Sequence, residues 1–244
     1  MDAVATAFSV IFAKEVFGGT GMNIFNPALI TRAFLFFAYP TKMSGDAVWV
    51  SGDSIFGMGK TVDGLTAATA LGQASTATDA MGYPAFSLDM VTGLIPGSIG
   101  ETSVIAIALG AIILLWTGVA SWKTMFSVFA GGIVMGLIFN VFGSTDNMMA
   151  QLPWYEHIVL GGFCFGAVFM ATDPVTSART ETGKYIFGFL IGVMAIIIRV
   201  LNPGYPEGMM LAILLMNIFA PLIDYCIVQK NITARENRLK STNN

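Results

Sequence analysis

The stretch YIFGFLIGVMAIIIRVL, residues 185–201, decides the fold, because Arg199 is its only charged residue. An α-helix rises about 1.5 Å per residue and the hydrocarbon core of a bilayer is about 30 Å thick, so roughly 20 apolar residues cross it. The stretch is long enough to do so unaided. It therefore predicts a membrane-spanning helix, and the rest of the chain indicates how many others accompany it.

Six further apolar runs flank this stretch. They occupy residues 1–17, 24–39, 103–120, 124–142, 157–171 and 209–228. The runs that begin at 103, 124 and 209 are long enough to cross a bilayer alone. Those that begin at 24 and 157 are shorter, and they abut Asn26-Pro27 and Asp173-Pro174. We expect an all-α integral membrane protein with about seven transmembrane helices, two of them short or broken.

The composition supports this class and excludes others. Hydrophobic residues make up 55% of the 244 residues and charged residues 11%, against roughly 25% charged in an average soluble domain. A net charge of -3 leaves no basic surface for phosphates, which excludes nucleic acid binding. Cys164, Cys226 and His157 are the only residues of their types, too few for a disulfide framework or a clustered zinc or iron–sulfur site.

The distribution of Lys and Arg gives the orientation, because these residues are retained on the cytoplasmic side. The segment 229–244 is basic, so we expect a transmembrane domain at 1–228 followed by a cytoplasmic tail. Lys123, Arg179 and Lys184 then fall inside, and the acidic loop 42–102 falls outside. Counting back also places Met1 outside, as expected for the C-terminal part of a longer membrane protein.

Two segments share a pattern of glycines followed by an interrupted helix. Gly18-Gly19 precedes Asn26-Pro27, and Gly161-Gly162 precedes Asp173-Pro174. Paired interrupted segments are typical of transporters with a site near the bilayer midplane. Pairs of glycines four residues apart indicate close helix packing, and they are Gly132 and Gly136, Gly162 and Gly166, and Gly188 and Gly192.

Acidic residues in or beside apolar runs are costly and suggest function. Asp173 and Asp224 each lie next to or shortly after a proline, and Glu207 lies at the start of the last run. A carboxylate beside a broken helix can bind a small hard cation or a proton together with freed carbonyl groups. The alternative is that Asp173 caps a helix and Asp224 anchors one at the interface. For Arg32 and Arg199, snorkelling, carboxylate pairing and contact with an anionic cofactor remain open.

The segment Asp63–Thr69 reads DGLTAAT. Its composition alone indicates a loop of small residues and the start of a helix, with Thr66 as a possible cap. The segment is also identified as a match to the pattern at which a flavin transferase joins FMN, through its phosphate, to the last threonine. That threonine is Thr69, and Asp63, Gly64 and Thr66 belong to the same recognition segment.

The resemblance extends beyond this motif and covers essentially the whole chain. It rests on the stretches Ala13–Gly21, Asn23–Pro27, Arg32–Pro40, Ala171–Ser177 and Leu201–Asp224. Together they resemble the B subunits of the sodium-translocating NADH:quinone oxidoreductases (NqrB), a family shared with the D subunits of Rnf complexes. The resemblance implies a bundle of about ten helices in inverted repeats, similar to urea transporters, with the first helices absent from this chain.

The same resemblance implies an electron carrier and ion translocase with two flavins. FMN is attached to Thr69, non-covalent riboflavin contacts Asn23 and Asn26, and ubiquinone is reduced while Na⁺ is exported along a path that includes Asp173 and Asp224. Implied partners are the A, C, D, E and F subunits of the Nqr complex, a flavin transferase and membrane lipid. The implied location is the bacterial inner membrane, with the C-terminus cytoplasmic and the FMN-bearing loop outside.

Other interpretations of the sequence remain open. One is an Rnf D-like component of an ion-translocating ferredoxin:NAD oxidoreductase. Another is a passive urea-type channel, and a third is a structural anchor whose flavin motif is unused. Covalent flavin at Thr69 would argue against the channel and the anchor.

Overall fold

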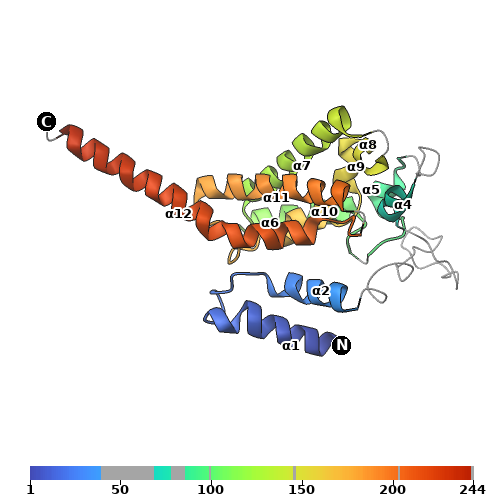
Figure 1. Ribbon diagram of the computed structural model, residues 1–244, viewed down its shortest axis with the longest axis horizontal. Helices are drawn as coiled ribbons and strands as arrows, with labels where there is room; N and C mark the ends of the chain where they lie inside the picture. Colours follow the sequence, from blue (N-terminus) through green and yellow to red (C-terminus); the bar gives the residue numbers. More distant parts are fainter. Residues whose placement is uncertain (40–68, 78–85, 99, 145–146, 203, 243–244) are drawn as a thin grey trace.

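The structure, a computed structural model, describes residues 1–39, 69–77, 86–98, 100–144, 147–202 and 204–242. Within these ranges every regular element is a helix (Figure 1), which confirms the all-α class. The elements are α1 (Asp2–Ala13), η1 (Glu15–Phe17), α2 (Pro27–Ala38), α4 (Ala70–Thr76), α5 (Asp89–Thr92), α6 (Val104–Trp116), α7 (Trp122–Phe142), α8 (Met148–Gln151), α9 (Trp154–Val159), α10 (Phe163–Phe165), η3 (Gly166–Met170), α11 (Glu181–Leu201) and α12 (Met209–Thr242).

Three helices of the described chain, α7, α11 and α12, are long and apolar enough to cross a membrane. They confirm the predicted spans at 124–142, 185–201 and 209–228. Helix α12 continues beyond the last of these to Thr242, because the polar residues of the basic segment sustain a helix equally well. The helix contains Pro221, and its C-terminal part extends away from the bundle at an angle to the part that packs within it (Figure 1).

The remaining apolar runs form shorter helices. Helix α6 has 13 residues, a length of roughly 20 Å, so the structure does not confirm that the run at 103–120 crosses a bilayer alone. The helix ends at Trp116, and the chain turns at Gly118, which has a φ of 70°. The run at 157–171 is broken, as predicted. It divides into α9, α10 and the π-helical η3, with a turn at Gly161 whose φ is 67°.

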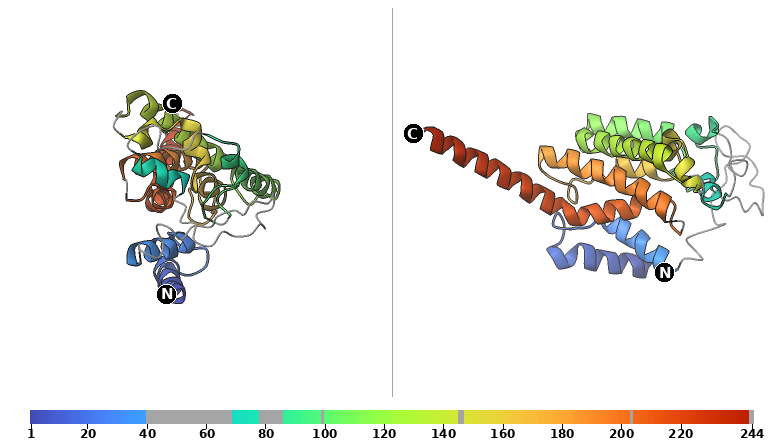
Figure 2. Two further views of the ribbon diagram at one scale, coloured as in Figure 1. Left: turned by 90° about the vertical axis from the view of Figure 1, so that its right-hand side faces the viewer. Right: turned by 45° about the horizontal axis from the view of Figure 1, so that its top comes forward.

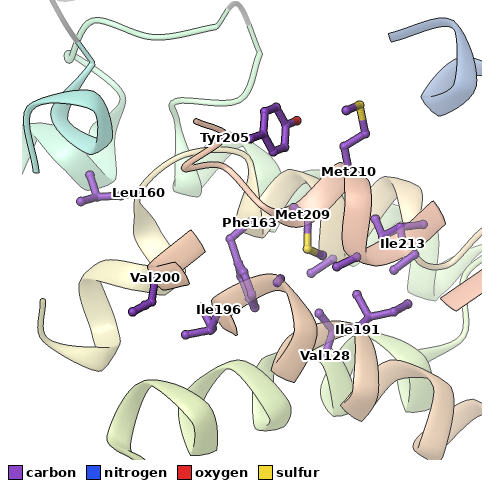
Figure 3. Close-up of a cluster of buried hydrophobic side chains, with 14 of the residues drawn as sticks. Val128, Leu160, Phe163, Ile191, Ile196, Val200, Tyr205, Met209, Met210 and Ile213 are labelled. Atoms are coloured by element: carbon purple, nitrogen blue, oxygen red, sulfur yellow. The ribbon is translucent and has the colours of Figure 1, made fainter. Parts of the chain in front are cut away.

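The core forms where α7 and α11 run parallel in close contact. A Cβ atom on Gly192 would lie 2.1 Å from the Val128 carbonyl oxygen, and one on Gly188 would lie 2.6 Å from the Thr124 carbonyl oxygen. Backbone therefore meets backbone, which confirms the packing role predicted for this pair of glycines. Figure 3 shows Phe163 pointing into the same core, between Ile196 of α11 and Met209 of α12.

We expect Gly192→Ala to lower the stability of the protein by about 1–3 kcal/mol or more, because the added methyl group must separate two backbones. Gly110→Ala is the matched control, since its Cβ would meet only the end of the Phe169 ring, a side chain that can shift. Thermal unfolding in detergent measures both. Equal Tm values for the two variants would contradict the close packing of α7 and α11.

Helices α1 and α2 form an antiparallel pair beside the rest of the bundle (Figure 2). The Ser9 hydroxyl of α1 donates a hydrogen bond to the Pro27 carbonyl of α2. The Phe36 ring of α2 contacts Tyr205 at a centroid distance of 4.7 Å. The connection between α1 and α2 lies at the end of the bundle from which α12 extends, whereas α4, α5 and α8 gather at the other end of the bundle (Figure 1).

Candidate functional site

Thr69 stands at the start of a helix that lies within the loop expected at 42–102. It is the N-cap of α4, and its Oγ1 accepts a hydrogen bond from the Gly72 N–H at 3.0 Å. A threonine oxygen satisfies one of the N–H groups that the first helical turn leaves without a partner. Because of this contact the Thr69 hydroxyl, the group that the motif singles out, is held in a fixed position on a half-buried residue. The other motif residues, Asp63, Gly64 and Thr66, lie outside the described residues.

One face of α4 packs against the core of the bundle. Ala70, Leu71 and Ala74 are buried in the main hydrophobic cluster. A Cβ atom on Gly161 would lie 3.0 Å from Leu71 Cδ2 and 3.3 Å from Arg199 Nη2, so helix, loop and guanidinium meet at this glycine. Figure 3 shows Leu160, the preceding residue, on the side of the core that faces α4. Thr69 thus extends from a helix that is anchored to the bundle.

Arg199 is fully buried beneath this helix, with 1% of its surface exposed. Its guanidinium donates hydrogen bonds to three backbone carbonyls, those of His157, Leu160 and Glu207. From the sequence, three interpretations of Arg199 were open: carboxylate pairing, snorkelling and contact with a cofactor. In the structure its hydrogen-bond partners are backbone carbonyls. Arg199 therefore ties the loop after α9 to the loop between α11 and α12.

Arg32 of α2 is paired with two carboxylates. Its guanidinium lies 2.9 Å from a Glu101 oxygen and 2.7 Å from a Glu207 oxygen, which confirms the carboxylate pairing considered from the sequence. The Tyr205 hydroxyl donates to Glu207 at 3.3 Å. Burial raises the pKa of the Glu101 carboxyl, and Arg32 opposes that rise. These contacts fix α2 to the loops at the same end as α4.

Asn23 and Asn26 lie in the connection between α1 and α2. Asn26 caps α2, because its Oδ1 accepts a hydrogen bond from the Ala28 N–H at 2.9 Å. Asn23 Nδ2 donates to the Phe25 carbonyl at 3.2 Å. The Nδ2 group of Asn26 and Oδ1 of Asn23 have no partner in the described part of the chain. Both amides can still bind a polar ring edge, and the connection that carries them lies at the opposite end of the bundle from α4 (Figure 1).

Asp173 and Asp224 accept hydrogen bonds from the segment that leads into α11. Asp173 accepts from the Val175 N–H at 3.1 Å and from the Thr176 hydroxyl at 2.9 Å. Asp224 accepts from the Arg179 N–H at 2.7 Å, and from the N–H and hydroxyl of Thr180 at 3.0 and 2.6 Å. Thr180 is in turn the N-cap of α11. Asp224 therefore has the anchoring role considered as an alternative to cation binding, whereas Asp173 stabilises a turn and caps no helix.

Within the described ranges no three or more His, Cys, Asp or Glu residues are grouped as metal ligands. A Na⁺ ion near these carboxylates would therefore depend on hydroxyl and backbone carbonyl oxygens, which suit a hard cation. The residues brought together by the structure are Asp224, Arg179 and Thr180. Asp173 belongs to the same connecting segment, six residues before Arg179.

Asn217 of α12 was not predicted from the sequence. Its side chain is 1% exposed, and neither of its polar atoms has a partner in the described structure. Pro221, four residues later, has no N–H to donate to the Asn217 carbonyl. Ile213 lies close to Gly166, and Asp224 close to Gly183, so Asn217 lies between these two contacts along α12. An asparagine four residues before a proline in an apolar run was the signal available in the sequence.

Comparison with known proteins gives a consistent result. Residues 1–233 match the sequence model of the NQR2, RnfD, RnfE family. Proteins named as the B subunit of Na(+)-translocating NADH-quinone reductase are similar to the chain in Pseudomonas paraeruginosa (52% identity over 96% of the chain), Chromohalobacter salexigens (52% over 97%) and Klebsiella pneumoniae (51% over 97%). The matches cover 56%, 55% and 56% of those relatives. The chain therefore spans about half the length of the curated relatives it matches.

Proposed function

The chain belongs to the NQR2, RnfD, RnfE family, and on this premise we propose that it acts as part of the B subunit of a sodium-translocating NADH:quinone reductase. In that role it carries electrons through the membrane from FMN attached to Thr69, by way of riboflavin, to ubiquinone. The observation that carries the proposal is the DGLTAAT segment ending at Thr69, whose hydroxyl caps a helix anchored to the core.

The residues proposed for the two flavins lie at opposite ends of the helix bundle (Figure 1). Thr69 offers a hydroxyl oxygen held by the Gly72 N–H, and that contact can persist when the oxygen becomes part of a phosphoester. Asn23 and Asn26 offer amide groups in the connection between α1 and α2. Bound flavins supply the electron transfer, and the protein sets their positions and surroundings. The separation of the two regions supports a route that crosses the membrane (Figure 1).

The proposed setting is a bacterial inner membrane, with the C-terminus cytoplasmic and Thr69 on the outer side. The three long apolar helices support a multi-pass membrane protein. The distribution of Lys123, Arg179 and Lys184, at the starts of α7 and α11, supports the inner placement of that end. The proposed partners are the A, C, D, E and F subunits of the complex and a flavin transferase.

We place Asp173 and Asp224 on the path by which Na⁺ leaves the cytoplasm. Acidic groups at helix breaks are suited to passing a hard cation between carboxylate, hydroxyl and carbonyl oxygens. The test uses the complete complex in sealed vesicles, to which NADH and quinone are added while Na⁺ uptake and quinone reduction are followed. Quinone reduction without Na⁺ movement would contradict the coupling.

We expect Asp224→Asn to raise the Na⁺ concentration needed for half-maximal quinone reduction by roughly tenfold, equivalent to about 1.4 kcal/mol, because the variant removes the negative charge that attracts the cation. Thr180→Val is the companion variant, because it removes the hydroxyl that donates to Asp224 and caps α11 while it leaves the carboxylate charge. If both variants lower Tm and neither changes the Na⁺ dependence, Asp224 only anchors α11.

A further inference from the structure

An apolar groove runs along the outer face of the α7–α11 pair. It encloses about 390 Å³. Its lining residues are Phe126, Ser127, Ala130, Tyr185, Ile186, Phe189 and Leu190. The Ser127 hydroxyl donates to the Lys123 carbonyl of its own helix at 2.6 Å, so it is not directed to an occupant. Because α7 and α11 meet through glycine backbone contacts, the groove has rigid walls. An occupant of this groove must be apolar along most of its length.

One end of the groove is cationic and aromatic. The Lys123 ammonium lies 5.9 Å from the Trp122 ring centroid and 5.8 Å from that of Tyr185. Lys123 and Lys184 share a single carboxylate, that of Glu181, with Lys184 at 2.7 Å. These side chains belong to the first turns of α7 and α11, so they lie at the end of the groove where both helices begin.

The charges at the mouth of the groove do not cancel. Lys123 and Lys184 share one carboxylate, that of Glu181, so one positive charge is in excess beside the apolar lining. Arg179 is exposed and lies further along the segment before α11, together with the carboxylates of Asp173 and Asp224. Aromatic rings at the level of the head groups and basic residues between transmembrane helices are the features that bind anionic lipids.

We propose that this groove is a binding site for an anionic phospholipid of the surrounding bilayer, with one acyl chain between α7 and α11 and the phosphate bound by Lys123 and Lys184. Tyr185 to Leu190 span roughly 8 Å of helix, so the groove holds the part of the chain nearest the head group. A neutral lipid or a quinone gains nothing from the cationic end. The site depends on membrane insertion alone and stands apart from the flavin chemistry.

The test uses the complete complex in nanodiscs of phosphatidylcholine that contain a small fraction of phosphatidylglycerol spin-labelled on its acyl chain. The fraction of immobilised label reports binding. Each basic residue near the membrane surface contributes roughly a fivefold factor in binding, so Lys123→Ala/Lys184→Ala is expected to lower the affinity roughly 25-fold. Ala130→Phe, which fills the groove, is expected to have a similar effect without changing the charge.

Two further variants test whether positive charge at the end of the groove increases lipid binding. Glu181→Gln removes the carboxylate that competes for both lysines and is expected to increase binding. Lys230→Ala, on the exposed part of α12, is the matched control and is expected to leave it unchanged. The Lys123→Ala/Lys184→Ala variant is expected to keep its Tm, which shows that it is folded. The Lys123→Arg/Lys184→Arg variant is expected to bind the labelled lipid, because it keeps both positive charges. Equal immobilisation of labelled phosphatidylcholine, or unaltered binding by the double variant, would overturn the proposal, as would occupation of the groove by another protein of the complex.

Discussion

Replacing Thr69 by alanine is expected to abolish covalent flavin in this chain, because no other oxygen stands at the end of the DGLTAAT segment. The alanine also removes the N-cap of α4, which costs about 1 kcal/mol of helix stability. The loss of flavin and the loss of the cap must therefore be separated. Flavin fluorescence of the band on a denaturing gel, after co-expression with a flavin transferase, measures attachment directly.

Two substitutions at the same position separate these effects. Thr69→Asn keeps a capping oxygen and lacks the hydroxyl, so we expect a stable helix without flavin. Thr69→Ser keeps both the cap and the hydroxyl and should retain at least part of the flavin. Ser75→Ala is the matched control within α4, since Ser75 only donates to the Gly72 carbonyl. Fluorescence that persists in Thr69→Asn would place the flavin on another residue.

Replacing Arg199 by leucine is expected to destabilise the protein by about 2–6 kcal/mol, because two buried carbonyls are left without a donor at about 1–3 kcal/mol each. The buried carbonyls of His157 and Leu160 lose the donor that Arg199 supplies, whereas the Glu207 carbonyl keeps the Met209 N–H. Because α4 rests on the same loop through Leu71 and Gly161, the flavin content should also fall. Unfolding in detergent and flavin fluorescence measure the two effects.

Arg179→Leu is the control for this substitution. Arg179 is exposed, and a surface change of this kind alters stability by about 0.5 kcal/mol or less. Arg199→Lys should lie between the two, since an ammonium group reaches fewer of the three carbonyls. An Arg199→Leu variant as stable as Arg179→Leu would show that the carbonyl contacts do not hold the loops together.

The sequence predicted the long helices well, because α7 and α11 are apolar over a bilayer thickness and hydropathy alone reveals such runs. The span expected at 103–120 is not confirmed, because α6 ends at Trp116 although the apolar run continues, and the chain turns at Gly118. The basic segment expected as a tail continues α12 as helix, because hydropathy measures polarity and a polar segment can also be helical. The interruption of the run at 157–171 was predicted, and the structure adds the turn at Gly161.

The site was predictable to the extent that its residues are marked locally. Thr69 was recognisable from seven consecutive letters, although the cap considered for Thr66 could not be compared because Thr66 lies outside the described residues. The partners of Arg32 are 69 and 175 residues away, so no local pattern could choose among the interpretations left open. The same holds for Arg199, whose partners are backbone carbonyls that any residue could supply.

The measurement that tests the flavin assignment most directly is peptide mass analysis around Thr69, in the complete protein purified from membranes that also contain a flavin transferase. We predict that the peptide containing Thr69 carries FMN as a phosphoester, and that fragmentation places the added mass on that threonine. An unmodified Thr69 in a correctly inserted protein, or flavin attached to a different residue, would contradict the assignment.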